Sequence, residues 1–122
     1  VIVHDGKVIG RGYNRRTIDK NTLAHAEIQA IRKACKKMND WRLEECTMYV
    51  TLEPCPMCAW AIINARIKNV YFGSWDLKYG AFGGAINLAK LANSKINIKG
   101  GIKEQECDKL LKDYFEKLRN EK

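Results

Sequence analysis

Residues 47–58, TMYVTLEPCPMC, decide the fold of this chain. The run Thr47–Leu52 is rich in β-branched and aromatic residues and predicts a buried β-strand. Pro56 suits the first position of a helix, where the missing N–H has no partner to lose, so a helix is predicted over residues 56–65. A strand that leads directly into a helix indicates the α/β class.

The sequence on either side continues this alternation. Asp5-Gly6, between the runs Val1–His4 and Lys7–Gly12, predicts an opening β-hairpin. Further strands are expected at residues 69–73 and 95–98. Apolar residues at helical spacing predict helices over residues 24–38 and 107–118, with a short helix near residues 86–91. This order predicts parallel pairing after the hairpin and one domain over residues 1–122.

One histidine and two cysteines have the residue types and spacing of zinc ligands. His25-Ala26-Glu27 lies at the start of a predicted helix, and Cys55 and Cys58 flank the start of the next one. One imidazole and two thiolates leave a fourth zinc position for water, which is typical of catalytic sites. The pattern H-x-E … P-C-x-x-C is the known signature of zinc-dependent nucleobase deaminases, in which the glutamate moves protons and does not bind the metal.

Two other kinds of site use a C-x-x-C pair. A structural zinc site would need a fourth protein ligand, and His4 lies beside a turn while the other cysteines fall in apolar patterns and resemble small core residues: Cys35, Cys46 and Cys107. A redox pair would leave His25 and Glu27 unexplained. We therefore favour one catalytic zinc per chain.

Charge and composition narrow the class of partner. The 122 residues carry a net charge of +8, and the excess lies before residue 103, because the last segment is balanced. Arg11, Arg15, Arg16 and Lys20 cluster before the histidine, which suits a polyanionic substrate, although a solvated basic surface is an equal alternative. No run of 18 apolar residues is present, and the odd cysteine count favours a reducing compartment, so we expect a cytoplasmic protein.

The chain resembles the bacterial tRNA-specific adenosine deaminases of the cytidine deaminase-like superfamily. The resemblance is carried by AHAEIQAI, WRLEECTMYVTLEPCPMCAWAI, RIKNVYFGSWD and CDKLLKDYFEKLR. It implies a three-layer α/β/α sandwich with a five-stranded mixed sheet, a homodimer, and a tRNA anticodon stem-loop as partner. It also implies zinc ligands at His25, Cys55 and Cys58, proton transfer by Glu27, and substrate contacts at these positions: Asn14, Ala26, Asp76, Lys78 and Phe115.

The sequence departs from the family pattern at several positions. We expect the family's N-terminal helix to be absent from this chain, and Trp60 stands where a small residue is usual. Phe82 and Gly84 likewise replace small or hydroxyl residues of a family loop.

Three functions remain to be distinguished. The leading hypothesis is hydrolytic deamination of adenosine to inosine at the wobble position of a tRNA anticodon. A free nucleobase or nucleoside deaminase, acting on guanine or cytosine, is the alternative. A catalytically silent zinc module is the third, and Glu27 argues against it because a structural site has no use for that carboxylate. On the last helix, Tyr114 and Phe115 are either core residues or, for Phe115, a stacking surface for a base.

Overall fold

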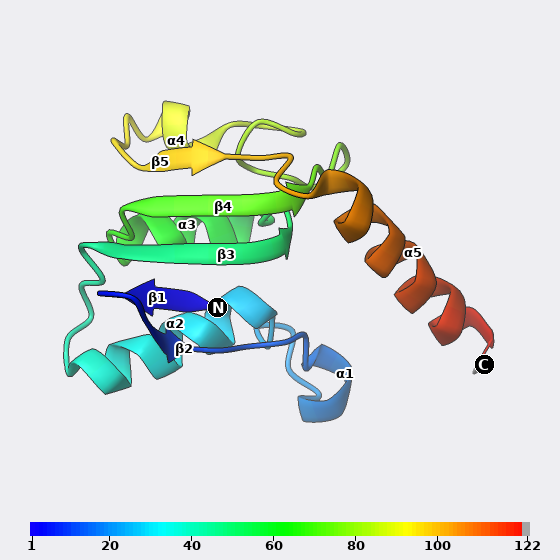
Figure 1. Ribbon diagram of the computed structural model, residues 1–122, viewed down its shortest axis with the longest axis horizontal. Helices are drawn as coiled ribbons and strands as arrows, with labels where there is room; N and C mark the ends of the chain where they lie inside the picture. Colours follow the sequence, from blue (N-terminus) through cyan, green and yellow to red (C-terminus); the bar gives the residue numbers. More distant parts are fainter. Residues whose placement is uncertain (121–122) are drawn as a thin grey trace.

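A five-stranded mixed sheet forms the centre of the molecule, which a computed structural model describes over residues 1–120 (Figure 1). The sheet order is β2-β1-β3-β4-β5, and the strands are β1 (Ile2–His4), β2 (Lys7–Gly10), β3 (Cys46–Leu52), β4 (Asn69–Ser74) and β5 (Asn97–Lys99). Strand β1 is antiparallel to both β2 and β3, whereas β3, β4 and β5 are parallel. The predicted α/β class with a five-stranded mixed sheet is confirmed.

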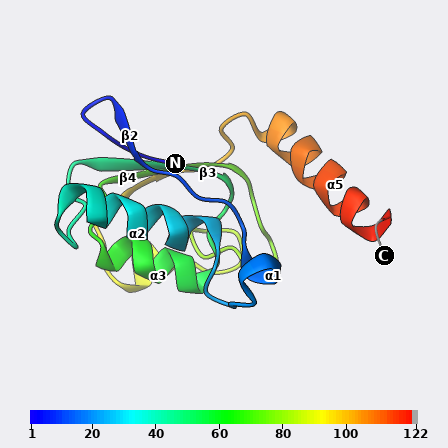
Figure 2. The same cartoon turned by 90° about the horizontal axis from the view of Figure 1, so that it is seen from below.

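The helices are distributed unevenly about the sheet. They are α1 (Arg16–Asp19), α2 (Ala26–Met38), α3 (Pro56–Asn64), α4 (Leu88–Leu91) and α5 (Glu104–Asn120). Helices α2 and α3 run side by side across one face of the sheet (Figure 2). Among the described residues, no helix is both long and apolar enough to cross a bilayer.

The predicted elements are present with small shifts in their ends. Asp5 and Gly6 have φ angles of 51° and 74°, as a tight hairpin turn of two left-handed residues requires. Strand β2 ends at Gly10, two residues early, and α2 begins at Ala26, because His25 is extended and acts as the N-cap. Helix α1 was not predicted from the sequence.

Small residues allow α2 to lie close to the sheet. Ala30 and Ala34 on α2 are almost fully buried. They face Gly10 of β2, where an added Cβ would lie 2.3 Å from the Ala30 carbonyl oxygen and 3.1 Å from the Ala34 Cβ. The close approach of these backbones fixes α2, and with it the residues at its N-terminus, against the sheet.

The opposite face of the sheet is largely uncovered. Tyr49 is 46% exposed, and its ring lies 5.5 Å from that of Tyr71. Next to these rings, side chains join three strands: Asn97 donates to Asn69 (3.1 Å), and Asn69 donates to Thr47 (3.2 Å). Polar residues thus occupy the end of this face nearest the start of β3, β4 and β5.

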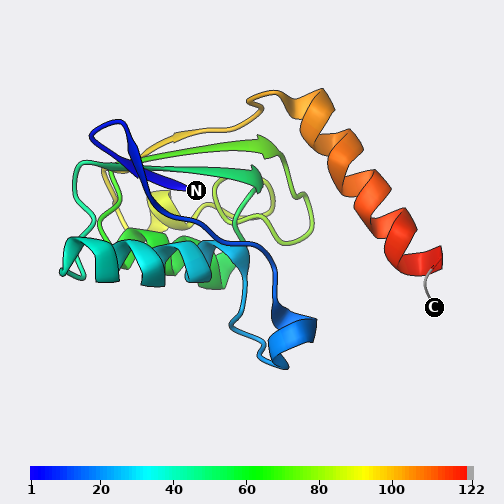
Figure 3. The same ribbon diagram turned by 60° about the horizontal axis from the view of Figure 1, so that its bottom comes forward.

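Helix α5 covers this second face only where it begins. Ile102 N–H donates to the Phe72 carbonyl (3.0 Å), the Ser74 hydroxyl donates to Asp108, and α5 contacts β4. The helix then projects away from the body of the molecule, beyond the carboxyl ends of β3 and β4 (Figure 3). The third layer implied by the resemblance is therefore partial in this structure.

Candidate metal centre

Two helix N-termini carry the three predicted metal ligands. His25 is the N-cap of α2, and Cys55 is the N-cap of α3, with Pro56 at the first helical position. The His25 and Cys55 side chains turn toward a common point, and Cys58, on the first turn of α3, joins them.

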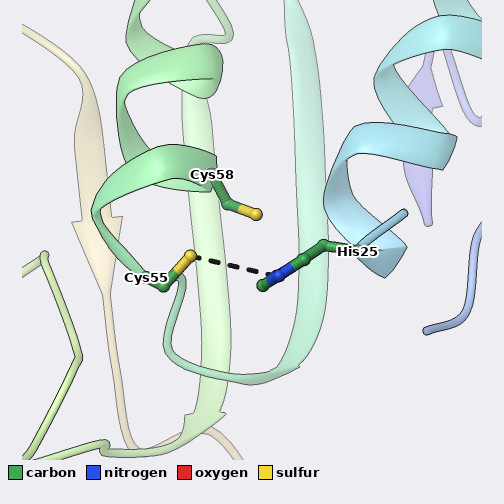
Figure 4. Close-up of side chains that lie close together, drawn as sticks. All are labelled: His25, Cys55 and Cys58. Carbon is green, nitrogen blue, oxygen red and sulfur yellow. Dashed lines mark hydrogen bonds between the residues drawn. The ribbon is translucent and has the colours of Figure 1, made fainter. Parts of the chain in front are cut away.

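The three side chains form a compact cluster at the junction of α2 and α3 (Figure 4). All of their ligand atoms lie within 4.8 Å of one another, and Cys55 Sγ lies 3.9 Å from His25 Nδ1. Cys58 is fully buried, whereas His25 and Cys55 are half-buried. The cluster therefore has a closed protein side and an accessible side.

The donor set suits zinc. A nitrogen and two sulfur atoms are ligands that zinc prefers, and three protein ligands leave one position open. The backbone N–H groups at the start of α3 favour the thiolate form that zinc binding requires. The residues present therefore fit a zinc ion, and in the described part of the chain no other group of three or more His, Cys, Asp or Glu side chains has such geometry.

The sequence and the fold both have close relatives. The sequence matches the MafB19-like deaminase family over residues 1–119. The tRNA-specific adenosine deaminase of Bacillus subtilis is 42% identical, and the aligned region covers 100% of this chain and 77% of the relative. The chain belongs to the tRNA-specific adenosine deaminase family. It is thus a member of a family of deaminases with a His/Cys/Cys site.

Solved structures support this family assignment. A structure from a study of A-to-I editing by tRNA:A34 deaminases at the wobble position has a TM-score of 0.81 and 39% identity, over 89% of this chain and 80% of that one. A guanine deaminase from Bacillus subtilis has a TM-score of 0.61 and 33% identity, over 76% of this chain and 73% of that one.

The deaminase places Glu27 beside the ligand cluster. Glu27 lies in the first turn of α2, two residues after His25. Burial raises the pKa of its carboxyl above the ordinary value, and the nearby Cys55 raises it further, whereas His25 and a hydrogen bond with Cys58 lower it. A half-buried carboxyl with a raised pKa is suited to accept and then release a proton in one reaction cycle.

A hydrogen bond between the two ligand cysteines shifts their pKa values in opposite directions. The pKa of Cys55 is lowered to about 5, chiefly because Cys58 hydrogen-bonds to its sulfur, with the backbone N–H groups of Cys58 and Met57 as further donors. The pKa of Cys58 is raised, chiefly by the same hydrogen bond and then by burial. Cys55 is therefore the more readily ionised of the two ligands.

Two of the predicted substrate contacts, Asn14 and Ala26, lie on the segment between β2 and the start of α2, Asn14 exposed and Ala26 half-buried. Asn14 Oδ1 accepts the N–H of Arg16, the first residue of α1, at 3.1 Å. Arg15 binds Asp19 (3.0 Å) and also donates to the Tyr13 hydroxyl. Ala26 is half-buried at the first position of α2, between the ligand His25 and Glu27. Part of the predicted basic cluster is therefore already paired within the chain.

The segment after β4 holds the next two predicted contacts. Asp76 Oδ1 accepts the backbone N–H groups of Lys78 and Tyr79, both at 3.0 Å, so this carboxylate shapes its own turn. The Lys78 ammonium lies 5.2 Å from the centre of the Tyr79 ring. Leu77 at the tip is 80% exposed.

Phe115 lies outside the cluster. It is 52% exposed on α5, and its ring meets that of Tyr114, which is 48% exposed, edge to face at 5.6 Å. The alternative that both aromatic residues belong to the core is wrong for this structure, because about half of each residue is exposed. The side chain of Leu118, the last residue of the predicted helix, lies outside the described residues.

Glu53, between β3 and the ligand Cys55, is buried and accepts three backbone N–H groups. Sequence reasoning missed the partner of this carboxylate, the glycine-rich segment Gly80–Gly84. Three glycines in five residues were the available signal, because they allow a backbone to approach a buried side chain closely.

Proposed function

We propose that this chain is a zinc-dependent hydrolase that converts adenosine to inosine at the wobble position of a tRNA anticodon. The observation that carries the proposal is the cluster of His25, Cys55 and Cys58 beside Glu27, in a chain that is 42% identical over its whole length to a tRNA-specific adenosine deaminase. The cluster supplies the chemistry, and the relationship supplies the substrate class.

One zinc ion per chain would be held by His25, Cys55 and Cys58. Zinc bound there would supply a Lewis acid that lowers the pKa of a water molecule to about 7. That water and the base would bind on the accessible side of the cluster, where His25 and Cys55 are half-buried.

Glu27 carries the proton transfers. Its carboxylate takes a proton from the attacking water and delivers it to a ring nitrogen. It then takes the second water proton from the hydroxyl on the attacked carbon and delivers it to the departing amine, so that ammonia leaves and adenosine becomes inosine. A carboxyl whose pKa is raised by burial is suited to act first as a base and then as an acid in the same turnover.

Several surface groups could hold the RNA around the target base. Helices α1 and α5 both lie beyond the carboxyl end of β3, where Leu52 leads into the ligand segment (Figures 1 and 2). Arg11, Arg16 and Lys20 are exposed on the α1 side, and Lys78 is exposed on the loop after β4. An unstacked loop nucleotide can enter a pocket, while its neighbours meet cationic and aromatic side chains of this kind.

Guanine deamination is a second candidate. The chain is 33% identical to the guanine deaminase from Bacillus subtilis, with a TM-score of 0.61. The catalytic chemistry is the same in both proposals, and the difference lies in whether the base arrives free or within an RNA loop.

The test is a substrate comparison. Purified protein is incubated separately with an anticodon stem-loop, free adenosine, guanine and cytosine, and inosine and ammonia are measured, with Glu27→Ala protein as the inactive control. We expect inosine from the stem-loop alone. Release of ammonia from guanine, with an unchanged stem-loop, would select the second candidate, and no product from any substrate would contradict both.

Binding to the stem-loop is expected to weaken as salt rises. Neutralising several phosphates releases counterions, so the affinity should fall by at least tenfold between about 50 and 200 mM salt. Fluorescence anisotropy with Glu27→Ala protein measures this without turnover. An affinity that does not change with salt would assign the basic cluster to a solvated surface.

We also expect a homodimer. The chain presents Trp60, 47% exposed, on the same helix as Cys58, and an aromatic side chain on a helix surface is typical of an interface. Analytical ultracentrifugation of the parent and of Trp60→Ala protein tests this expectation, because loss of the dimer in the variant would place Trp60 in the contact.

A further inference from the structure

A buried carboxylate lies two residues before the ligand Cys55. Glu53 follows β3 and is 2% exposed, although its side chain is an acid. In the described part of the chain no basic side chain forms a salt bridge with it. A buried carboxylate without a counter-charge needs hydrogen bonds to stay in the interior, so its partners reveal its role.

Its partners are backbone N–H groups from one loop, residues 76–84. Glu53 Oε1 accepts the Asp76 N–H at 3.0 Å. Glu53 Oε2 accepts the N–H groups of Phe82 at 2.9 Å and of Gly84 at 2.8 Å. Both oxygen atoms are therefore committed to holding the two ends of this loop together.

The loop closes on the carboxylate without side chains between them. A Cβ added at Gly84 would lie 2.2 Å from Glu53 Oε1, and one added at Gly80 would lie 2.3 Å from the same atom. Only glycine allows the backbone to approach this closely. The loop backbone at Gly80 and Gly84 therefore packs directly against the Glu53 carboxylate.

The same loop is fixed to the ligand segment by backbone hydrogen bonds. The Ala81 N–H donates to the Pro54 carbonyl at 2.9 Å, and the Glu53 N–H donates to the Ser74 carbonyl at 2.9 Å. The Asp76 carboxylate in turn accepts the backbone N–H groups of Lys78 and Tyr79 at the exposed tip of the loop. A continuous network therefore joins the residue before Cys55 to the loop tip.

We propose that Glu53 is a positioning residue, which holds loop 76–84 in a fixed relation to Cys55 so that the loop tip meets the substrate at the metal centre. This inference rests on the proposed function. Glu53 does not carry protons in this scheme, because both of its oxygen atoms accept backbone N–H groups and the side chain is closed to solvent.

The test uses Glu53→Gln, which keeps the shape of the side chain but turns an acceptor into a donor that faces a backbone N–H. Glu44→Gln is the matched control, because Glu44 is exposed at the opposite end of β3. Zinc content, amide hydrogen exchange at residues 76, 82 and 84, kcat and KM are measured on full-length protein. Stem-loop affinity is measured in the Glu27→Ala background, where binding is read without turnover.

We expect Glu53→Gln to keep its zinc and to raise amide exchange in the loop by about tenfold, as loss of one hydrogen bond predicts. KM and the dissociation constant for the stem-loop should rise by a similar factor, with kcat changed less than threefold. Gly84→Ala, which disturbs the same contact from the other side, should reproduce the rise in KM, and it serves as the variant if Glu53→Gln does not fold.

Three results would overturn the proposal. They are loss of zinc, a fall in kcat with a shifted pH profile at unchanged KM, and faster loop exchange with unchanged affinity and KM. If the parent deaminates a free base and does not act on the stem-loop, the proposed tRNA substrate is wrong. The role of Glu53 is then tested with that base: a higher KM in Glu53→Gln protein, with little change in kcat, would still support a positioning role.

Discussion

Helices α2 and α5 both have amphipathic sequences, but α2 packs along the sheet and most of α5 does not. On α2, Ala30 and Ala34 are 2% and 0% exposed, and the helix lies flat on the sheet. On α5, Leu110 is 61% exposed and Phe115 is 52% exposed, and the helix leaves the sheet after its first turns. Hydrophobic periodicity alone predicts both helices and does not distinguish them.

Small residues at the contact explain how closely α2 packs. Alanines opposite Gly10 let the backbone of α2 approach the sheet, and this approach fixes His25 at the N-terminus of the helix. Helix α5 has large residues on its stripe and is held by contacts near its start, at Ser74 and Phe72. We therefore expect α2 and α3 to hold the catalytic residues in fixed positions, and α5 to contribute to binding of a partner.

Removal of a ligand should have the largest effect. We expect Cys58→Ser protein to purify with little or no zinc, because two remaining ligands hold the ion far more weakly. Cys107→Ser is the control from α5, where the thiol lies outside the cluster, and it should keep one zinc per chain. Elemental analysis measures both, and equal zinc in the two variants would contradict the assignment.

Loss of Glu27 should lower activity while sparing the metal. We expect Glu27→Ala to reduce turnover by about 10²–10⁴-fold, the usual contribution of general acid–base catalysis. Zinc content should match the parent, since the cluster consists of His25, Cys55 and Cys58. Activity within tenfold of the parent would exclude Glu27 as the proton carrier.

A methyl group at Gly10 tests the contact between α2 and the sheet. The added Cβ would lie 2.3 Å from the Ala30 carbonyl, so the backbones must separate. We expect Gly10→Ala to lower the free energy of unfolding by about 1–3 kcal/mol, as overpacking usually does. Urea denaturation measures it, and Gly6→Ala is not a suitable control because Gly6 has a positive φ of 74°.

Substitution on α5 should have the smallest effect on stability. Because Phe115 is half exposed, Phe115→Ala should change the free energy of unfolding by no more than about 0.5 kcal/mol. Stem-loop affinity should nevertheless fall by about ten- to hundredfold if a base stacks on the ring. A large drop in Tm with unchanged affinity would instead show that α5 folds back onto the sheet in solution.

The junction between β3 and α3 was predictable from the sequence because its signals are local. A β-branched run, a proline at a helix start and the ligand spacing each constrain the backbone within a few residues. The same holds for the hairpin turn at Asp5-Gly6. His25 and Cys55 could be paired despite their separation because their combination is a known signature.

The remaining features depend on contacts between distant residues. Helix α1 has only four residues, so it has no periodicity to detect, and local hydrogen bonds such as that from the Arg16 N–H to Asn14 hold it. The loop that Glu53 holds takes its form from hydrogen bonds across 23 to 31 positions of the sequence. The course of α5 depends on what covers the second face of the sheet, which hydrophobic pattern does not specify.

The side-chain ladder of Asn97, Asn69 and Thr47 also bears on how the chain avoids misfolding. These residues are direct neighbours in the registers of β3, β4 and β5. A slip of one strand by one residue would turn an amide toward the apolar helical side, where it would lose its partner. Mispaired intermediates are thereby penalised on the face that α5 covers only in part, so the ladder favours correct strand register during assembly.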